Sequence, residues 1–341
     1  MQKLSNTSLK LPETDNAPVD SWHYVEFRDG KHDQNYVEWK YFNFNQKGLA
    51  GYIVYYILDP EHRTKIGGGR LLARMFRQDE LLGSMRKIPI SRIQFDALSA
   101  GIDMDGSKIV ESDPHNYRIT GVVGNLSWDL QYKQKALSIE AFANINPGLL
   151  RWEKANWFIK MPRAQVEGII KINSKTVPIN TIGYTDANWG EIMPLFSRFE
   201  WGQYSDEQLS FIFGAVYKLW KVQNTYFYLI LGNQIFQLNK PRFAIKHKKW
   251  MEGGNSTLKV PSESEFIMRD EQFLIKFSSK LIHSDLMALK ISALLPKPMI
   301  SEQIVQYKGI IEKNGRPLYK FEGMGFKEWS TKSWKGSPID F

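Results

Sequence analysis

The residues best suited to chemistry lie within positions 183–190, where the chain reads Gly-Tyr-Thr-Asp-Ala-Asn-Trp-Gly. This stretch places one carboxyl group, Asp186, among the rings of Tyr184 and Trp189 and the amide of Asn188. Burial among rings raises the pKa of a carboxyl group, and ring faces attract positive charge that develops on carbon. The stretch therefore predicts a site that protonates or polarises an unsaturated lipid, as cyclisation or hydration requires.

The same residues also fit a purely structural role. Asp and Asn next to glycine commonly form turns, and Trp189 fits a place in a hydrophobic core. Both interpretations of Asp186, as a pocket acid and as a turn residue, stay open at this point.

Four further segments accompany the Asp186 stretch. They are Glu38-Trp39-Lys40-Tyr41-Phe42, residues 157–168, Phe199-Glu200-Trp201-Gly202, and the glycine-containing residues 307–328, which end in Gly-Phe-Lys-Glu. Their order resembles the lipocalin-like hydratase and cyclase superfamily, which includes carotenoid hydratases, tocopherol cyclases, AttH-type proteins and fungal decalin-forming Diels–Alderases. The resemblance implies an all-β fold of two lipocalin-like β-barrel domains packed together, with a ligand cavity at their junction.

Two positions depart from the pattern of the hydratases. Where those proteins typically carry histidines on either side of the motif aspartate, this chain has Thr185 and Ala187. Histidine is the side chain best able to shuttle protons near pH 7. Its replacement favours a cyclase that works through pocket shape and one hydrogen bond.

Composition narrows the function classes. The chain has 341 residues, enough for two domains with separate cores, and an aromatic share of 13% that can line apolar cavities. The absence of cysteine excludes disulfides and thiolate catalysis and fits a reducing compartment. The first eight residues contain no apolar segment of a signal peptide, and no run has the length of a membrane span. We therefore expect a cytoplasmic protein.

The net charge of +9 is concentrated most densely at residues 240–250. We interpret this basic cluster as the solvated face of a strand and its loop, because it lies in no recognisable nucleic-acid-binding fold. A transient contact with a membrane surface is a second interpretation. The expected partner is a hydrophobic small molecule and no nucleic acid, while the oligomeric state is not predicted.

The dominant hydrophobic period is two, as in residues 126–132, which predicts half-buried strands. Gly232-Asn233 and Asn314-Gly315 predict hairpin turns. Short segments at 79–85 and 285–289 suggest helices. Many short strands separated by turns favour sandwiches or barrels.

We expect a mobile tail over residues 1–15, an N-terminal lipocalin-like domain over 16–200 and a C-terminal one over 201–341. The boundary lies near residues 195–205, because Met193-Pro194 interrupts strand pairing. No internal repeat is obvious, although two barrels of one family can be diverged copies.

Other chemistries find no support. The six histidines are scattered without metal-ligand spacing, so no metal site is predicted. The glycines at 67–69 lack the Gly-Lys-Ser/Thr of a phosphate loop and predict a flexible turn. No Gly-x-Ser-x-Gly elbow of a hydrolase is present.

Four residues outside the central motif are candidates for the pocket wall: Glu38, Trp39, Tyr41 and Trp201. A structural role is equally open for them, with Trp39 packing in the barrel and Glu38 hydrogen-bonded to backbone or to an arginine. Adjacent strand residues point to opposite faces, so at most one of Glu38 and Trp39 lines a given cavity unless a bulge intervenes. We interpret Glu328 as a structural anchor near the chain end.

The sequence thus predicts a cofactor-independent cyclase or isomerase that acts on a long apolar polyene, of isoprenoid or polyketide origin. In an acid-catalysed version, Asp186 protonates the substrate while Tyr184, Trp189 and Trp201 stabilise a carbocation before ring closure or water capture. In a pericyclic version, the cavity folds the substrate, and Asp186, Asn188 or Tyr184 hydrogen-bonds a carbonyl group. The alternative from another class is a non-catalytic lipid carrier that uses the same cavity.

Overall fold

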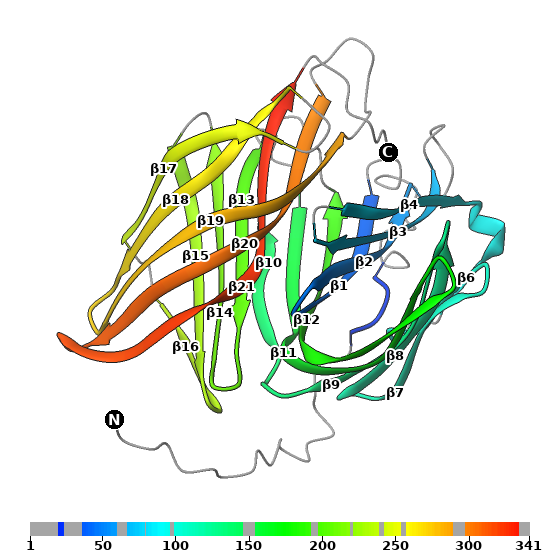
Figure 1. Ribbon diagram of the computed structural model, residues 1–341, viewed down its shortest axis with the longest axis horizontal. Coiled ribbons are helices and arrows are strands. Elements are labelled where there is room, and N and C mark those ends of the chain that lie inside the picture. The colour runs from blue at the N-terminus through cyan, green and yellow to red at the C-terminus, as the bar shows by residue number, and fades with distance from the viewer. Residues whose placement is uncertain are drawn as a thin grey trace.

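The computed structural model describes residues 20–23, 36–59, 67–78, 80–95, 99–145, 154–191, 197–218, 221–238, 242–253, 257–288 and 297–333. Within these ranges the chain is almost entirely β-strand, and the one helical element is a 3₁₀ turn at Ile90–Arg92. The strands form two curved sheets, A and B, which lie side by side (Figure 1). The all-β prediction is confirmed.

The strands of sheet A are β1 (Tyr36–Gln46), β2 (Leu49–Leu58), β3 (Gly68–Arg77), β4 (Glu80–Ile88), β5 (Ile93–Phe95), β6 (Ile102–Met104), β7 (Ser107–Asp113), β8 (Asn116–Val123), β9 (Leu126–Gln134), β10 (Ile139–Ile145), β11 (Lys154–Ile172) and β12 (Lys175–Glu191). The strands of sheet B are β13 (Ser197–Ser205), β14 (Leu209–Lys218), β15 (Lys221–Leu231), β16 (Gln234–Gln237), β17 (Arg242–Glu252), β18 (Lys259–Arg269), β19 (Phe273–Ala288), β20 (Lys297–Lys313) and β21 (Arg316–Ser333).

The two sheets repeat one topology. Sheet A runs β4-β3-β2-β1-β12-β11-β9-β8-β7-β6-β5, with β10 on β11, and sheet B runs β16-β15-β14-β13-β21-β20-β19-β18-β17. In each, a four-strand meander pairs through its first strand with the last strand of the sheet. The described chain therefore builds the same arrangement twice.

The repeat extends to the register of the first and last strands. A Glu-Trp pair lies in β1 (residues 38–39) and again in β13 (residues 200–201), and in each case the glutamate is opposite a tryptophan, Trp189 or Trp329. Because successive strand residues face opposite sides, each glutamate points into its own sheet's interior and each tryptophan of the pair points toward the other sheet. A repeat of two residues is too short to recognise in the sequence alone, and the strand register reveals it.

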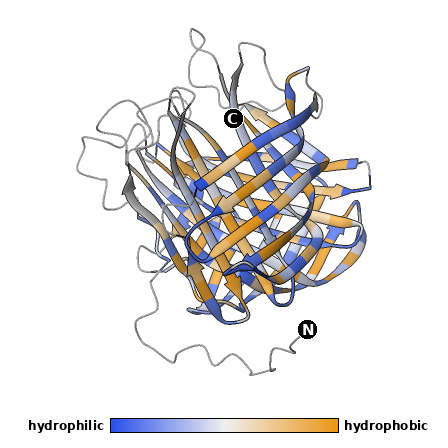
Figure 2. Ribbon diagram, turned by 90° about the vertical axis from the view of Figure 1, so that its left-hand side faces the viewer, coloured by the Kyte–Doolittle hydropathy of each residue, from blue (hydrophilic) through white to orange (hydrophobic). Residues whose placement is uncertain are grey.

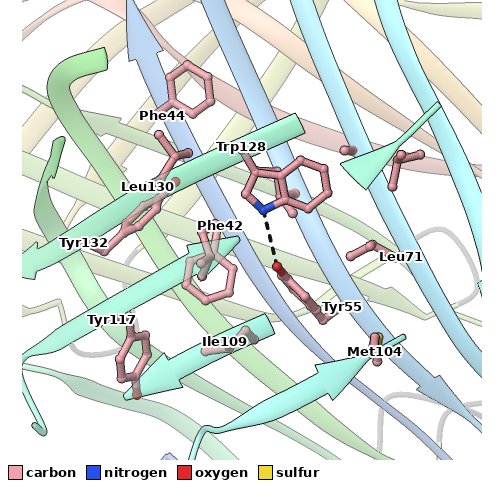
Figure 3. Close-up of a cluster of buried hydrophobic side chains, with 14 of the residues drawn as sticks. Phe42, Phe44, Tyr55, Leu71, Met104, Ile109, Tyr117, Trp128, Leu130 and Tyr132 are labelled. Carbon is pink, nitrogen blue, oxygen red and sulfur yellow. Dashed lines mark hydrogen bonds between the residues drawn. The ribbon is translucent and has the colours of Figure 1, made fainter. Parts of the chain in front are cut away.

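Sheet A curves around its own core, shown in Figure 3. In β9 the residues predicted to alternate do so, with Leu126, Trp128, Leu130 and Tyr132 buried. The indole N–H of Trp128 donates to the Tyr55 hydroxyl at 3.4 Å, which satisfies the polar atom of a buried ring. Figure 2 shows the same alternation of hydrophobic and hydrophilic residues along the strands of sheet B.

Both predicted hairpins are present, since Leu231 pairs with Gln234 and Lys313 pairs with Arg316. At the second hairpin, Asn314 and Gly315 both have positive φ, at 51° and 75°. This conformation matches the right-handed twist of the flanking strands, and Asn-Gly adopts it readily.

Two helix predictions are wrong. Residues 80–85 lie in β4 and residues 285–288 end β19, and each segment pairs with a neighbouring strand. Tertiary pairing overrides the weak local preference for helix. The predicted turn at residues 67–69 is also wrong: Gly68 and Gly69 begin β3 and are buried. A Cβ on Gly69 would lie 2.4 Å from Ile93 Cδ1, so glycine makes room for packing there.

The predicted tail over residues 1–15 and the Met193-Pro194 break lie outside the described residues. The last strand of sheet A ends at Glu191, and the first strand of sheet B begins at Ser197.

Gly183 lies where β12 passes close to β1. A Cβ at this position would lie 2.3 Å from the Asn43 carbonyl oxygen and 2.5 Å from Val166 Cγ2. We expect Gly183→Ala to lower the free energy of unfolding by about 1–3 kcal/mol, because the strands must separate to accept the methyl group. Urea denaturation measures this loss. An unchanged midpoint would mean that the contact between β1 and β12 relaxes freely.

Candidate functional site

Asp186 faces sheet B because of its position in β12. Tyr184, Asp186 and Asn188 alternate with residues that face the interior of sheet A, so these three share the face that meets sheet B. The apolar cluster between the sheets combines residues from both of them. Its buried members on sheet A include Tyr41, Tyr52, Trp157 and Tyr184, and those on sheet B include Trp201, Ile212, Met287, Ile304 and Phe326. We call this region the junction.

Asp186 is buried in the junction, with 5% of its surface exposed. Its Oδ2 atom accepts hydrogen bonds from the indole N–H of Trp157 at 2.8 Å and from the Tyr184 hydroxyl at 2.7 Å. The Asn188 amide lies 3.3 Å from Oδ1. Asp186 is therefore a strand residue with a fixed side chain, and the turn interpretation is wrong.

Burial raises the pKa of Asp186 to about 7, although the hydrogen bonds from Tyr184 and Trp157 oppose the rise. The nearby Glu328 raises it further. Loss of solvation disfavours the carboxylate, and the two donors restore only part of that loss. Asp186 therefore holds its proton up to about neutral pH, as a general acid must.

Three aromatic rings pack against one another next to Asp186. Trp201 of β13 lies edge-on to Tyr41 with ring centroids 5.8 Å apart, and 5.5 Å from the ring of Tyr184. Burial and the neighbouring Asp186 raise the pKa of Tyr184 well above its usual value, and the nearby indole N–H of Trp201 opposes part of this rise. It nevertheless makes no hydrogen bond of normal geometry within the described part of the chain.

A row of polar residues crosses sheet B opposite Asp186. Trp201, Glu328, Glu302 and Asp285 are successive cross-strand partners on β13, β21, β20 and β19, so their side chains share one face. The Tyr41 hydroxyl donates to Glu302 Oε1 at 2.5 Å and so connects the two sheets. Burial and the neighbouring Glu328 raise the pKa of Glu302 well above its usual value. Glu328 therefore belongs to the junction, and its role as a structural anchor stays a prediction.

A buried ion pair lies at the Asp285 end of this row. Arg74 of β3 contacts Asp285 of β19 through Nε at 2.7 Å and through a second nitrogen at 3.1 Å. The Tyr52 hydroxyl donates to the same carboxylate at 2.8 Å. Asp285 is thus neutralised across the junction.

The structure brings together five of the eight predicted site residues: Tyr41, Tyr184, Asp186, Asn188 and Trp201. Trp39 has the same orientation as Asn188, its strand partner, and lies at the edge of the cluster with its ring 6.0 Å from that of Tyr56.

Glu38 and Trp189 are not part of this group, because they occupy the other face of their strands. Glu38 is fully buried and accepts hydrogen bonds from the His23 backbone N–H and, at 2.6 Å, from the Tyr36 hydroxyl. Trp189 stacks on the ring of His23 at 3.8 Å. Both residues hold His23 against β1 and β12.

The two motif positions that lack histidine share this other face. Thr185 and Ala187 are buried and alternate with the residues of the junction. Their identity therefore says little about proton transfer beside Asp186.

Trp157, Glu302, Asp285 and Arg74 are junction residues that sequence reasoning did not assign to the site. Trp157 lies in a segment that supported the resemblance, but its contact with Asp186 was not foreseen. Glu302 and Asp285 carry no local motif. Their positions depend on strand pairing and on the packing of the two sheets.

The basic cluster is solvated as predicted. Lys246, Lys248 and Lys249 of β17 are exposed, and Lys248 and Lys249 form ion pairs with Glu265 at 2.8 Å and Glu263 at 2.9 Å.

We expect replacement of Lys246, Lys248 and Lys249 by glutamate to leave turnover of a dispersed substrate within about twofold of the parent, because exposed ion pairs contribute little. Binding to anionic vesicles should weaken. Turnover and vesicle co-sedimentation measure the two effects, and a large loss of turnover would contradict the assignment of this face as solvent-exposed.

A second candidate for a ligand site, the hollow beside β6 and β7, has fewer groups that could do chemistry than the junction. This open hollow, lined by residues such as Phe95, Ile102 and Val110, contains one carboxyl group, Glu111. That carboxylate accepts the Ala100 backbone N–H at 2.9 Å. Among the described residues, no three potential metal ligands gather at one place, and no helix is long and apolar enough to cross a membrane.

Several solved structures share the fold of this chain at low sequence identity. No protein-family model matches the sequence, and no curated protein does. A solved structure of a protein assigned as AttH from Nitrosomonas europaea is 13% identical, with a TM-score of 0.64 over 86% of this chain and 91% of that chain. CghA with Sch210972 is 10% identical, with a TM-score of 0.61 over 87% and 88% of the two chains. Kievitone hydratase from Nectria haematococca is 12% identical, with a TM-score of 0.60 over 87% and 89%. The resemblance predicted from the sequence is confirmed at the level of the fold.

Proposed function

We propose that this chain is a cofactor-independent enzyme of the cyclase, isomerase or hydratase type, and that its substrate is a long apolar polyene bound at the junction. The observation that carries the proposal is the environment of Asp186. This carboxyl group is buried, has a pKa of about 7 and lies among the rings of Tyr184, Trp157 and Trp201. The kievitone hydratase fold is consistent with such chemistry.

In the acid-catalysed version, Asp186 gives its proton to an alkene carbon. Oδ2 accepts two short hydrogen bonds and Oδ1 accepts only the longer one from Asn188, at 3.3 Å, so the acidic proton belongs on Oδ1. The faces of Tyr41, Tyr184 and Trp201 then stabilise the carbocation through their quadrupoles. Ring closure or capture of water completes the reaction.

In the pericyclic version, the junction holds the polyene in a reactive fold and Asp186 or Tyr184 donates a hydrogen bond to a substrate carbonyl. Orientation alone lowers a barrier by about 7–11 kcal/mol in favourable intramolecular reactions. Substrate entry requires that the packed side chains of the junction move apart in either version, and the interdomain cavity stays a prediction.

A panel of apolar polyenes tests the proposal. Squalene, lycopene and an all-trans polyenoic acid would be incubated with the purified protein, and products would be identified by mass spectrometry. New isomers, cyclic products or hydrates that depend on Asp186 would support the enzyme. A lipid extracted from the protein in stoichiometric amount and never converted would instead establish a carrier. Failure to bind or convert any panel compound would contradict the proposed substrate class.

A further inference from the structure

Glu302 and Glu328 carry more negative charge than their surroundings neutralise. They are direct cross-strand partners on β20 and β21, so their side chains share one face, with Glu302 buried and Glu328 half-buried. Arg74, the cation nearest along the row, is already bound to Asp285. Burial and the neighbouring Glu328 raise the pKa of Glu302, and adjacent carboxyl groups shielded from solvent do not both ionise readily, so the pair holds one proton between them.

The groups around the pair are mostly neutral or already paired. The titratable and charged groups that face it from neighbouring strands are Tyr41 on β1, Tyr52 and Tyr56 on β2, Arg70 and Arg74 on β3, Tyr184 and Asp186 on β12, and His283 and Asp285 on β19. Burial and the neighbouring carboxylates raise the pKa of Tyr41, Tyr52 and Tyr56 well above the ordinary value of tyrosine. These phenols therefore donate hydrogen bonds and do not compete for the proton.

An unpartnered donor adjoins the pair. Trp201 is the cross-strand partner of Glu328 and is 8% exposed, yet its indole N–H has no hydrogen-bond partner among the described residues. A buried donor without a partner costs about 1–3 kcal/mol. This N–H, near the Tyr184 hydroxyl, is available to an acceptor on a ligand that enters the junction.

The pair and Asp186 are close neighbours. Tyr41 is the cross-strand partner of Asp186, and its hydroxyl binds Glu302 across the junction. Glu328 is near enough to raise the pKa of Asp186. A ligand that reaches Asp186 beside Trp201 therefore lies within reach of both acid groups.

We propose that Glu328, with Glu302 sharing its proton, is the base that completes the reaction begun by Asp186; this inference rests on the proposed function in its acid-catalysed version. The alkene π electrons take the proton of Asp186 and form a C–H bond, which leaves a cation on the neighbouring carbon. Glu328 then removes a proton from the carbon next to the cation, and that C–H electron pair becomes the new double bond.

In hydration, water oxygen bonds to the cation and Glu328 takes the proton that water releases. In both cases one proton leaves Asp186 and one arrives on the carboxyl pair. The proton returns to Asp186 through solvent after product release. The cycle therefore needs no oxidant or reductant.

The pH dependence of kcat tests this assignment on whichever panel polyene the wild-type protein converts. Turnover should fall on the alkaline side as Asp186 ionises and on the acid side as the carboxyl pair takes a second proton. Glu328→Gln should lower kcat by about a hundredfold and abolish the acid-side fall, because the amide accepts no proton. Glu328→Asp should show the acid-side fall again, because its carboxylate can take a proton. A purely structural role for Glu328 predicts no such recovery.

Glu322→Gln is the matched control, since Glu322 is an exposed carboxylate on the same strand, 2.8 Å from Lys308. It should keep the wild-type profile. A folded Glu328→Gln protein with wild-type kcat and an unchanged profile would overturn the assignment while leaving the role of Asp186 intact.

Infrared titration of protein with ¹³C-labelled glutamate tests the shared proton without any substrate. In the wild type and in Glu322→Gln, a protonated carboxyl signal should persist at pH 7 and a second should appear as the pH is lowered, whereas Glu302→Gln and Glu328→Gln should each lose this second step. A wild type without a protonated carboxyl signal at pH 7, or variants that keep both steps, would overturn the shared proton. If the wild type converts no panel compound, the proposed function fails, and this titration still decides whether the pair holds one proton.

Discussion

Asp186→Asn should lower kcat on a converted polyene by about a hundredfold or more, equivalent to at least about 2.7 kcal/mol of transition-state stabilisation. Asparagine keeps the size of the side chain and still accepts hydrogen bonds from Trp157 and Tyr184, but it has no acidic proton. In the wild type, the alkaline-side fall in turnover should occur as pH rises through the Asp186 pKa of about 7. Steady-state kinetics between pH 5 and 9 measure both effects.

Stability measurements separate this chemical effect from a structural one. The folded state raises the pKa of Asp186 from 3.8 to about 7, so it binds this proton more tightly than the unfolded chain does. The contribution of Asp186 to stability is therefore complete below about pH 4 and is lost as pH rises to about 7. Asp186→Asn should remove this dependence and should be at least as stable as the wild type above pH 7.

Asp129→Asn is a suitable control, because Asp129 is a partly exposed carboxylate on β9, paired with Arg118 at 2.7 Å. It should leave kcat unchanged. Normal turnover per folded Asp186→Asn molecule would disprove the acid role. A mild loss there, together with a severe loss in Trp201→Ala, would instead favour the pericyclic version.

Asp285→Asn should destabilise the protein by about 3–5 kcal/mol, because it leaves Arg74 buried without its counter-charge. The two side chains are 10% and 3% exposed, so solvent compensates little of the loss. The pair joins β3 of sheet A to β19 of sheet B, and we expect its loss to loosen the packing between the sheets. Chemical denaturation measures the free energy of unfolding, and protection of junction amides from hydrogen exchange reports the loosening.

The double variant Arg74→Met with Asp285→Leu distinguishes the cost of an unpaired charge from the value of the pair. Removal of both charges should recover most of the lost stability, as expected when apolar residues of similar size replace a buried ion pair. Equal destabilisation of the single and double variants would show that the pair itself, together with the Tyr52 hydrogen bond, holds the sheets together.

The all-β fold could be predicted from the sequence because alternation and turn chemistry are local. The period of two at residues 126–132 and the Asn-Gly turn at 314–315 determine strand and hairpin over a few residues. The order of the short motifs also led to the correct fold. The two helix predictions failed because the segments at 80–85 and 285–288 gain strand partners, which no short window reveals.

The candidate site was predictable only in part. The alternation of Tyr184, Asp186 and Asn188 follows from their spacing in one strand, and so does the opposite orientation of Trp189. Glu302 and Asp285 lie more than 200 residues from Tyr41 and Tyr52, whose hydroxyl groups they bind. Those contacts exist because sheet B packs its polar row against sheet A. Register within each sheet and packing between the sheets are non-local, so tertiary structure alone determined which carboxyl groups surround Asp186.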